Sequence, residues 1–111
     1  MRMTSLLLSL ILLTGYQSTA HADTIAEFTL IIKDHKFTPT QLTVPAGKKI
    51  RLIVDNQDAS AEEFESYSLN REKVIPGKTK AKIFIGPLKP GTYDFFGEFH
   101  MKTALGKIVA Q

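Results

Sequence analysis

Alternation of apolar and polar residues, interrupted at short intervals by Gly or Pro, is the feature that most restricts how this chain can fold. It is clearest in the stretch KTKAKIFIG, where Thr79, Ala81, Ile83 and Ile85 alternate with Lys78, Lys80, Lys82 and Phe84. Successive side chains of a β-strand point to opposite faces, so this pattern separates an apolar face from a lysine-rich one. We predict a strand here whose lysines form a solvated face rather than a docking patch.

The same alternation recurs in EFTLIIK, residues 27–33, and in KKIRLIVDN, residues 48–56. Turn-forming residues separate these stretches at TPTQ, VPAGKK, IPGK and GPLKPGTY. Short alternating segments between regular turns are typical of an all-β sandwich or barrel, and we predict about seven strands. Only FESYSLNREKV, residues 64–74, lacks a clear period, and we predict a short helix or an irregular crossover between two sheets there.

The first 22 residues have a different character. Arg2 is followed by the apolar run LLLSLILL and then by an Ala20-x-Ala22 pattern, as in a secretory signal with its cleavage site. A membrane anchor is the alternative, but the run is much shorter than the roughly 20 residues of a spanning helix. We therefore predict a signal peptide at residues 1–22 and an exported, periplasmic domain at residues 23–111, beginning at Asp23. Cleavage after Ala20 is the alternative and would leave His21 at the N-terminus.

The composition excludes several function classes. The sequence contains no cysteine, so a disulfide framework, a thiolate metal site and a thiol nucleophile are all excluded. The formal charge is +3, or about +2 without Arg2, and the lysines are scattered among acidic residues, which does not indicate nucleic-acid binding. There is no Ser/His/Asp grouping or phosphate loop, which disfavours a hydrolase.

The mature sequence resembles a cupredoxin over nearly its whole length. The resemblance rests on FTPTQLTVPAGKKIRLIVDNQD, on a strand beginning near EEFES, and on LKPGTYDFFGEFH with a final GKIV. It implies a Greek-key β-sandwich or barrel. In that family a mononuclear copper that shuttles electrons is held by one histidine after the N-x-D turn and by a Cys, a His and usually a Met near the last strand.

Carried onto this sequence, the match of ligands is partial. His100 lies three residues after Gly97, which stands where the family's cysteine would be. Glu62 falls where the first histidine is expected, Met101 is closer to the histidine than the family's Met usually lies, and Leu105 precedes the final GKIV. Without a thiolate, the short copper–sulfur bond of a blue site cannot form.

The pair EEFES and FFGEFH resembles a smaller group of periplasmic cupredoxin-like proteins encoded with Ftr-type bacterial ferrous-iron uptake systems. In that group the protein is thought to oxidise iron or to hand it to a membrane permease. The resemblance therefore implies an inner-membrane iron permease and a periplasmic iron-binding protein as partners.

Acidic residues are concentrated in the same two motifs. If Phe64 points into the core, Glu62 points inward with it, whereas Glu63 and Glu65 face away. We therefore predict Glu62 as a metal ligand and the other two as surface or supporting groups. Carboxylate and imidazole ligands suit Fe, Mn, Cu(II) or Zn.

Each of the other candidate ligands also has a second interpretation. His100 is predicted as a ligand, the alternative being a histidine that bonds the backbone at the barrel end. Glu98 either lies in the site or pairs with Arg71 or Lys102, and Met101 is either a ligand or core filler. His35, in an early turn, is predicted to be a surface histidine.

These observations lead to a metal site of Glu62, His100, Met101 and Glu98 in an exported cupredoxin-like domain. Copper is the first metal expected, with iron as substrate or alternative ligand, and the expected role is ferrous-iron uptake. A copper carrier or electron-transfer protein is one alternative, and a metal-free interaction module is the other.

Overall fold

The computed structural model describes Gly15 and residues 25–111, which form nine strands and one short 3-10 helix. The elements are β1 (Ala26–Lys33), β2 (Lys36–Thr38), β3 (Gln41–Val44), β4 (Ile50–Asn56), β5 (Glu62–Ser66), β6 (Arg71–Ile75), β7 (Lys80–Ile85), β8 (Gly91–Gly97), η1 (Glu98–His100) and β9 (Leu105–Ala110). The signal peptide predicted at residues 1–22 lies, apart from Gly15, outside the described residues. Among those residues, no helix has the length and apolar character needed to cross a membrane.

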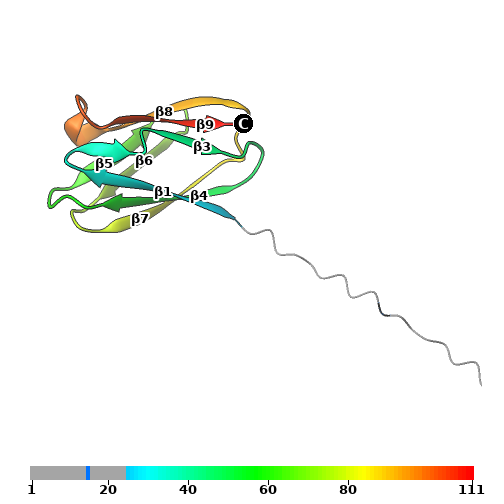
Figure 1. Ribbon diagram of the computed structural model, residues 1–111, viewed down its shortest axis with the longest axis horizontal. Helices are drawn as coiled ribbons and strands as arrows, with labels where there is room; N and C mark the ends of the chain where they lie inside the picture. Colours follow the sequence, from blue (N-terminus) through cyan, green and yellow to red (C-terminus); the bar gives the residue numbers. More distant parts are fainter. Residues whose placement is uncertain (1–14, 16–24) are drawn as a thin grey trace, which may run out of the picture.

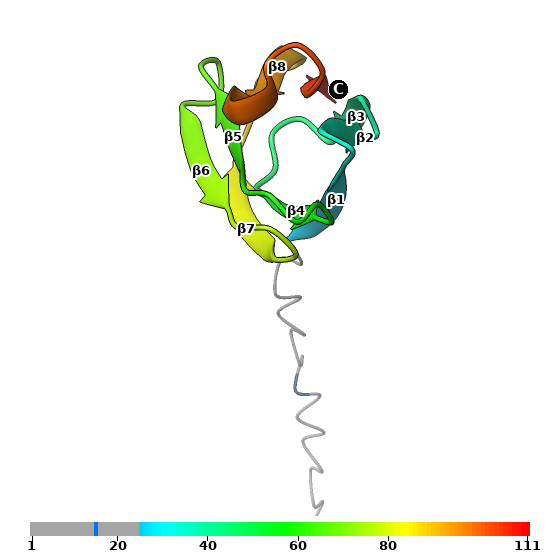
Figure 2. The same cartoon turned by 90° about the vertical axis from the view of Figure 1, so that its left-hand side faces the viewer.

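The strands form two sheets that face each other across one core. One sheet has the order β2-β1-β4-β7, and the other has the order β3-β9-β8-β5-β6. Figure 2 shows the two sheets curving around the core, so that the sandwich has the outline of a flattened barrel. Two parallel pairs, β1 with β4 and β3 with β9, join segments distant in sequence, and the other pairs are antiparallel. The predicted all-β Greek-key sandwich is confirmed.

The core is built from the faces that the alternation predicted. In β4 every second residue is fully buried, with Leu52 and Val54 inside and Arg51 on the other face. In β7 the inward residues are Ile83 and Ile85, while the lysines are exposed. Three aromatic rings complete the core next to the site described below; they are Phe37, Phe64 and Phe95.

The stretch 64–74 differs from the prediction. It is neither a helix nor a crossover between sheets but a hairpin, in which β5 and β6 pair antiparallel within one sheet. The periodicity is hidden because β5 directs polar side chains inward: Glu62 and Ser66 are both 1% exposed. The Ser66 hydroxyl donates a hydrogen bond to the Asp94 carbonyl oxygen at 2.6 Å, which compensates for its burial. The edge strand β6 adds no signal, because four of its five residues are exposed.

The number of strands also exceeds the prediction of about seven. The additional strands are short: β2 has three residues and β3 has four. Strands of this length contain too few residues for a period of two to be recognised.

Candidate metal centre

Three segments that are far apart in the sequence meet at the end of the sandwich opposite the C-terminus (Figure 1). They are the turn between β1 and β2, the start of β5, and η1. They bring His35, Glu62 and His100 together, and one ligand atom from each lies within 4.8 Å of the others. We call these three residues the inner site.

Glu62 is the buried acid of the inner site. Its side chain is 1% exposed and points inward with Phe64, as the parity of β5 predicted. Its Oε1 accepts hydrogen bonds from the backbone N–H groups of Phe99, at 2.9 Å, and Glu63, at 3.0 Å. Its Oε2 lies 2.5 Å from Nδ1 of His100. One oxygen is thus fixed by the backbone, and the other is directed at the imidazole.

His100 ends η1, which directly follows β8. The loop after β8 closes on itself, because the Gly97 N–H donates to the Ala104 carbonyl oxygen at 2.8 Å and the Ala104 N–H donates to the His100 carbonyl oxygen at 2.9 Å. The His100 side chain is 28% exposed. Glu62 and His100 thus lie in direct contact, and their binding of metal stays a prediction.

Gly97 has no space for a side chain, although its φ of −94° would permit one. A Cβ at this position would lie 2.6 Å from Cδ of Glu62 and 2.7 Å from Cβ of Ala104. The family resemblance places the copper-binding cysteine at this position. The Glu62 carboxyl group therefore fills the volume into which a side chain at position 97 would extend.

His35 belongs to the inner site, although the sequence analysis placed it apart as a surface residue. Its ring stacks on that of His100, with centroids 3.5 Å apart and an interplanar angle of 23°. His35 and Asp34 have φ values of 56° and 54° and join Lys33 to Lys36, so they are the two central residues of a tight hairpin turn. A polar pair between two strand-like segments was the only signal in the sequence for this turn.

The turn is held by hydrogen bonds from other parts of the chain. The Asp58 carboxylate accepts the backbone N–H groups of Asp34, at 2.8 Å, and His35, at 3.0 Å. The His35 N–H bond is the largest cause that keeps the pKa of Asp58 below its ordinary value. On the other side, the Thr103 hydroxyl donates to the His35 carbonyl oxygen at 2.7 Å. These bonds hold the turn beside the loop that carries His100.

The ligand types of the inner site suit a transition metal, but His35 and His100 must turn out of their stacked arrangement for the in-plane lone pairs of both rings to point at one ion. Two imidazoles and one carboxylate suit Cu(II), Zn or Fe. Bonds of about 2.0–2.2 Å allow two ligands of one ion to be at most about 4.4 Å apart, so atoms within 4.8 Å are already near that spacing. An ion would replace the proton between Glu62 and His100, and these two side chains would separate to admit it. Within the described part of the chain, the buried Nδ1 of His35 has no hydrogen-bond partner, and it lies 3.6 Å from Oδ2 of Asp58.

The two remaining predicted ligands are Met101 and Glu98. Met101 is 56% exposed, just after η1, and its role as a ligand stays a prediction. Glu98 is exposed and does not join the group of ligand atoms formed by the inner site. The alternative that Glu98 pairs with Arg71 is not what the structure shows, because the Arg71 guanidinium donates to the carbonyl oxygens of Leu69, Asn70 and Phe84.

Glu98 instead joins a second group of carboxylates, which we call the outer carboxylate cluster. Its members are Glu63, Glu65, Glu72 and Glu98, and one oxygen from each lies within 4.8 Å of the others. Hydrogen bonding to Glu72, followed by burial and by the nearby Glu98, raises the pKa of Glu63 to about 8. Hydrogen bonding to Glu98 likewise raises the pKa of Glu65. This cluster lies on the opposite face of β5 from Glu62.

A two-sheet Greek-key sandwich with a histidine in the loop before its last strand defines a cupredoxin-like protein. A family model described as a cupredoxin-like domain matches residues 5–110, and the chain belongs to that family.

Individual relatives agree with this assignment. The chain is 49% identical over 87 residues to an uncharacterized protein of Rickettsia prowazekii, covering 78% of this chain and 70% of the relative. It is 33% identical over 98 residues to the iron uptake system component EfeO of Yersinia pseudotuberculosis, covering 84% of this chain but only 25% of EfeO. The chain thus spans a quarter of the length of EfeO.

A solved structure shares the fold. Auracyanin A, a blue copper protein of Chloroflexus aurantiacus, superimposes with a TM-score of 0.68 at 15% identity, covering 79% of this chain and all of auracyanin A.

Proposed function

We propose that this protein is an exported metal-binding protein that supports ferrous-iron uptake, with copper as the metal of the inner site. The observation that carries the proposal is the meeting of His35, Glu62 and His100 at one end of a cupredoxin fold. The similarity to the iron uptake component EfeO supports the cellular role, over the quarter of EfeO that the chain spans.

The residues of the inner site have distinct roles in this proposal. Oε1 of Glu62 is held by two backbone N–H groups, so Oε2 is a fixed anionic ligand. His100 supplies a partly exposed imidazole close to solvent, and His35 supplies a second one across the stacked pair. Copper(II) bound here would supply a one-electron acceptor for Fe(II). The alternative role in iron uptake is hand-over of iron without oxidation.

The partners follow from the same proposal. An exported iron-binding or iron-oxidising protein would deliver its product to an inner-membrane iron permease, with a periplasmic iron-binding protein as a second partner. Phe99, Met101 and Leu105 are each at least 50% exposed near His100 and would form part of a contact surface. Apolar residues at the rim of a site are typical of protein contacts.

Export is tested by the mass of the mature protein. We expect intact-mass analysis of periplasmic material to give a chain that begins at Asp23, because Ala20 and Ala22 supply the small residues of a cleavage site. A chain that retains residues 1–22 would contradict export by this route. A chain that begins at His21 would place a new amine and imidazole chelate at the N-terminus.

Metal binding is tested by calorimetric titration with Cu(II), and with Fe(II) under anaerobic conditions. Removal of a ligand should weaken binding by at least the roughly 10–100-fold that changes to supporting residues cause. We expect this loss for Glu62→Ala and for His100→Ala. Glu27→Ala is the matched control, because Glu27 is a half-exposed carboxylate that pairs with Arg51 in the other sheet.

The cellular role needs a separate test. A strain that lacks the gene should regain growth on limiting ferrous iron with the parent protein and with Glu27→Ala, but not with His100→Ala. If His100→Ala binds metal like the parent and restores growth fully, the proposal is wrong.

Two rival functions predict different outcomes. A copper carrier or electron-transfer protein unrelated to iron would bind Cu(II) at the inner site and have no effect on ferrous-iron growth. A metal-free interaction module is favoured by the direct Glu62–His100 contact, which satisfies both groups without an ion. The absence of Cu(II) and Fe(II) binding in calorimetry would support that module.

A further inference from the structure

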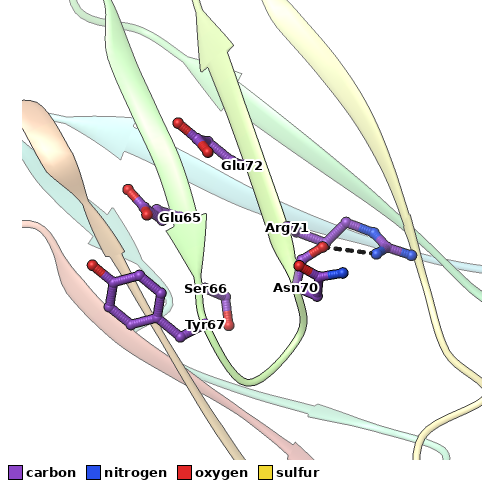
Figure 3. A pocket seen from close by; sticks show the side chains of 6 residues that line it. All are labelled: Glu65, Ser66, Tyr67, Asn70, Arg71 and Glu72. Atoms are coloured by element: carbon purple, nitrogen blue, oxygen red, sulfur yellow. Dashed lines mark hydrogen bonds between the residues drawn. The ribbon is translucent and has the colours of Figure 1, made fainter.

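Asp58 is a second carboxylate beside the inner site. It lies in the turn after β4, and its Oδ2 is 3.6 Å from Nδ1 of His35. The carboxylates of the β5–β6 hairpin point elsewhere: Figure 3 shows Glu65 and Glu72 projecting from the two strands on the same side, and Glu65 lies on the opposite face of β5 from Glu62. The Asp58 side chain is 14% exposed, so its charge is less screened by water than that of a surface carboxylate.

The backbone of the turn that carries His35 has an unfavourable conformation. Asp34 and His35 have φ values of 54° and 56°, in the left-handed region that a Cβ atom disfavours. Turns with two such residues are usually formed by pairs such as Asn-Gly or Gly-Gly. A histidine in this conformation therefore points to a role for its imidazole, because a glycine would form the turn more easily.

Asp58 stabilises this turn and is itself fixed by the rest of the domain. Its carboxylate accepts the N–H groups of both central residues of the turn, at 2.8 and 3.0 Å. Its own N–H donates to Oδ1 of Asn56 at 3.1 Å, and its carbonyl oxygen accepts the Lys78 N–H at 2.9 Å. Asn56 is fully buried, and its Nδ2 donates to the carbonyl oxygens of Ser60 and Ile75. The carboxylate is therefore held in place from the end of β4 and from β6.

The two ring nitrogens of His35 have different surroundings. The side chain is 44% exposed, yet Nδ1 is buried and has no hydrogen-bond partner among the described residues. Its distance of 3.6 Å from Asp58 is too long for a hydrogen bond but short enough for attraction between charges. The carboxylate therefore favours a proton on Nδ1, and in a neutral imidazole this leaves the lone pair on Nε2.

We propose that Asp58 is a positioning residue of the inner site, which keeps the proton of neutral His35 on Nδ1 and thereby makes Nε2 the nitrogen that binds the metal. This inference rests on the proposed function, since it takes His35 as a ligand. Histidine ligands usually donate their other ring N–H to a carboxylate, a carbonyl oxygen or water, which fixes the tautomer and the orientation of the ring.

The proposal also accounts for how His35 can leave its stack on His100. Asp58 accepts the backbone N–H of His35, and the Thr103 hydroxyl donates to its carbonyl oxygen. Because both sides of this residue are held, the ring turns toward an ion by rotation of its own side chain while the turn keeps its place.

The first test uses metal-free protein labelled with ¹⁵N, whose imidazole signals in NMR spectra identify the tautomer. At about pH 9, where histidine is neutral, we expect His35 to carry its proton on Nδ1 in the parent. Asp58→Asn should lose this preference, because the amide is uncharged. The asparagine oxygen can still accept an N–H of the turn, so the variant should fold, and circular dichroism checks this. Asp34→Asn, which removes an exposed carboxylate of the same turn, should keep the parent tautomer.

Thr103→Val separates control of the ring from support of the turn. This variant loses the hydroxyl bond to the His35 carbonyl oxygen but keeps the charge of Asp58. We expect it to keep the proton on Nδ1. If Thr103→Val changes the tautomer as much as Asp58→Asn does, Asp58 only supports the turn, and the proposal is overturned.

The second test is calorimetric titration with Cu(II). Asp58→Asn should bind about 10–100-fold more weakly than the parent, the usual effect of removing the partner of a histidine ligand, and Asp34→Asn should bind like the parent. In a His35→Ala background, adding Asp58→Asn should cause no further loss, because Asp58 acts through His35. A further loss of similar size would show general attraction of the cation and would overturn the proposal.

Failure of this inference and failure of the proposed function give different results. If the parent binds Cu(II) and Asp58→Asn binds it equally well, or if His35 of the parent carries its proton on Nε2, the inference is overturned and the proposed function stands. If the parent binds no Cu(II), the proposed function fails. The spectra of the metal-free protein would still show whether Asp58 fixes the proton of His35.

Discussion

The imidazole rings of His35 and His100 lie face to face, with centroids 3.5 Å apart, although they come from turns at the two ends of the folded domain's sequence. Glu62 contacts the same His100 ring at 2.5 Å, so the ring lies in contact with both the carboxylate and the second imidazole. The inner site is therefore a unit of three side chains in mutual contact. Replacing any one of them should change the surroundings of the other two.

The first prediction concerns His35, the member that the sequence analysis left out. His35→Ala should weaken Cu(II) binding by at least about 10-fold, because it removes a nitrogen ligand and the stacking partner of His100. Calorimetric titration measures the change. Lys36→Ala is the control on the same hairpin, since Lys36 is exposed. If His35→Ala binds Cu(II) with the affinity of the parent, His35 is not a ligand and the site consists of Glu62 and His100.

The second prediction concerns Gly97. Gly97→Ala should destabilise the protein by about 1–3 kcal/mol, as is usual for overpacking, because the new methyl group overlaps Glu62 and Ala104. It should also displace the Glu62 carboxyl group and weaken Cu(II) binding. Urea denaturation gives the free energy of unfolding, and calorimetry gives the affinity.

A double-mutant cycle checks the cause. In Glu62→Ala the space beside position 97 is free, so adding Gly97→Ala should cost less than it does in the parent. We expect a coupling of about 0.5–3 kcal/mol, the range for residues in contact. Additive effects would show that the Glu62 carboxyl group does not limit this position.

The third prediction is spectroscopic. Protein loaded with Cu(II) should show only weak ligand-field absorption, because the chain has no cysteine to form the copper–thiolate bond of blue sites. Visible absorption and electron paramagnetic resonance spectra of the same copper-loaded sample test this prediction. An intense blue band from pure protein is the outcome that would contradict a site of imidazole and carboxylate ligands.

The fourth prediction concerns pH and Glu63. In the folded protein the pKa of Glu63 is raised from 4.5 to about 8, so between these values the folded state binds a proton that the unfolded state has lost. The free energy of unfolding should therefore fall as the pH rises from about 4.5 to about 8. Glu65 acts in the same direction, and the groups that face Glu63 are Glu65, Glu72 and Glu98.

Comparison with Glu63→Gln isolates this effect from other titrating groups. The variant carries no titrating carboxyl at this position, so its stability relative to the parent should be greater at pH 8 than at pH 5. Metal-free protein in chelator is used for urea denaturation at both pH values. An identical pH dependence in parent and variant would show that Glu63 titrates normally.

Much of the fold could be predicted from the sequence because burial leaves a period of two in strands with one face in the core. This held for β1, β4 and β7, whose apolar residues are the core residues. It failed for β5 and β6, since β5 buries Glu62 and Ser66 among apolar residues and β6 is an exposed edge. A pattern of hydrophobicity cannot show a strand whose inward positions are polar.

For the candidate site, the sequence by itself determined the ligand types and one orientation. The lack of cysteine excludes a thiolate, and the spacing of Glu62 and Phe64 determines that both side chains point to the same face of β5. Only the tertiary structure decided that His35 joins the inner site and that Glu98 joins the outer carboxylate cluster. The physical reason is that these contacts depend on how turns from different strand pairs meet at the end of a sandwich. Side-chain periodicity describes one strand at a time and carries no information about which turns come together.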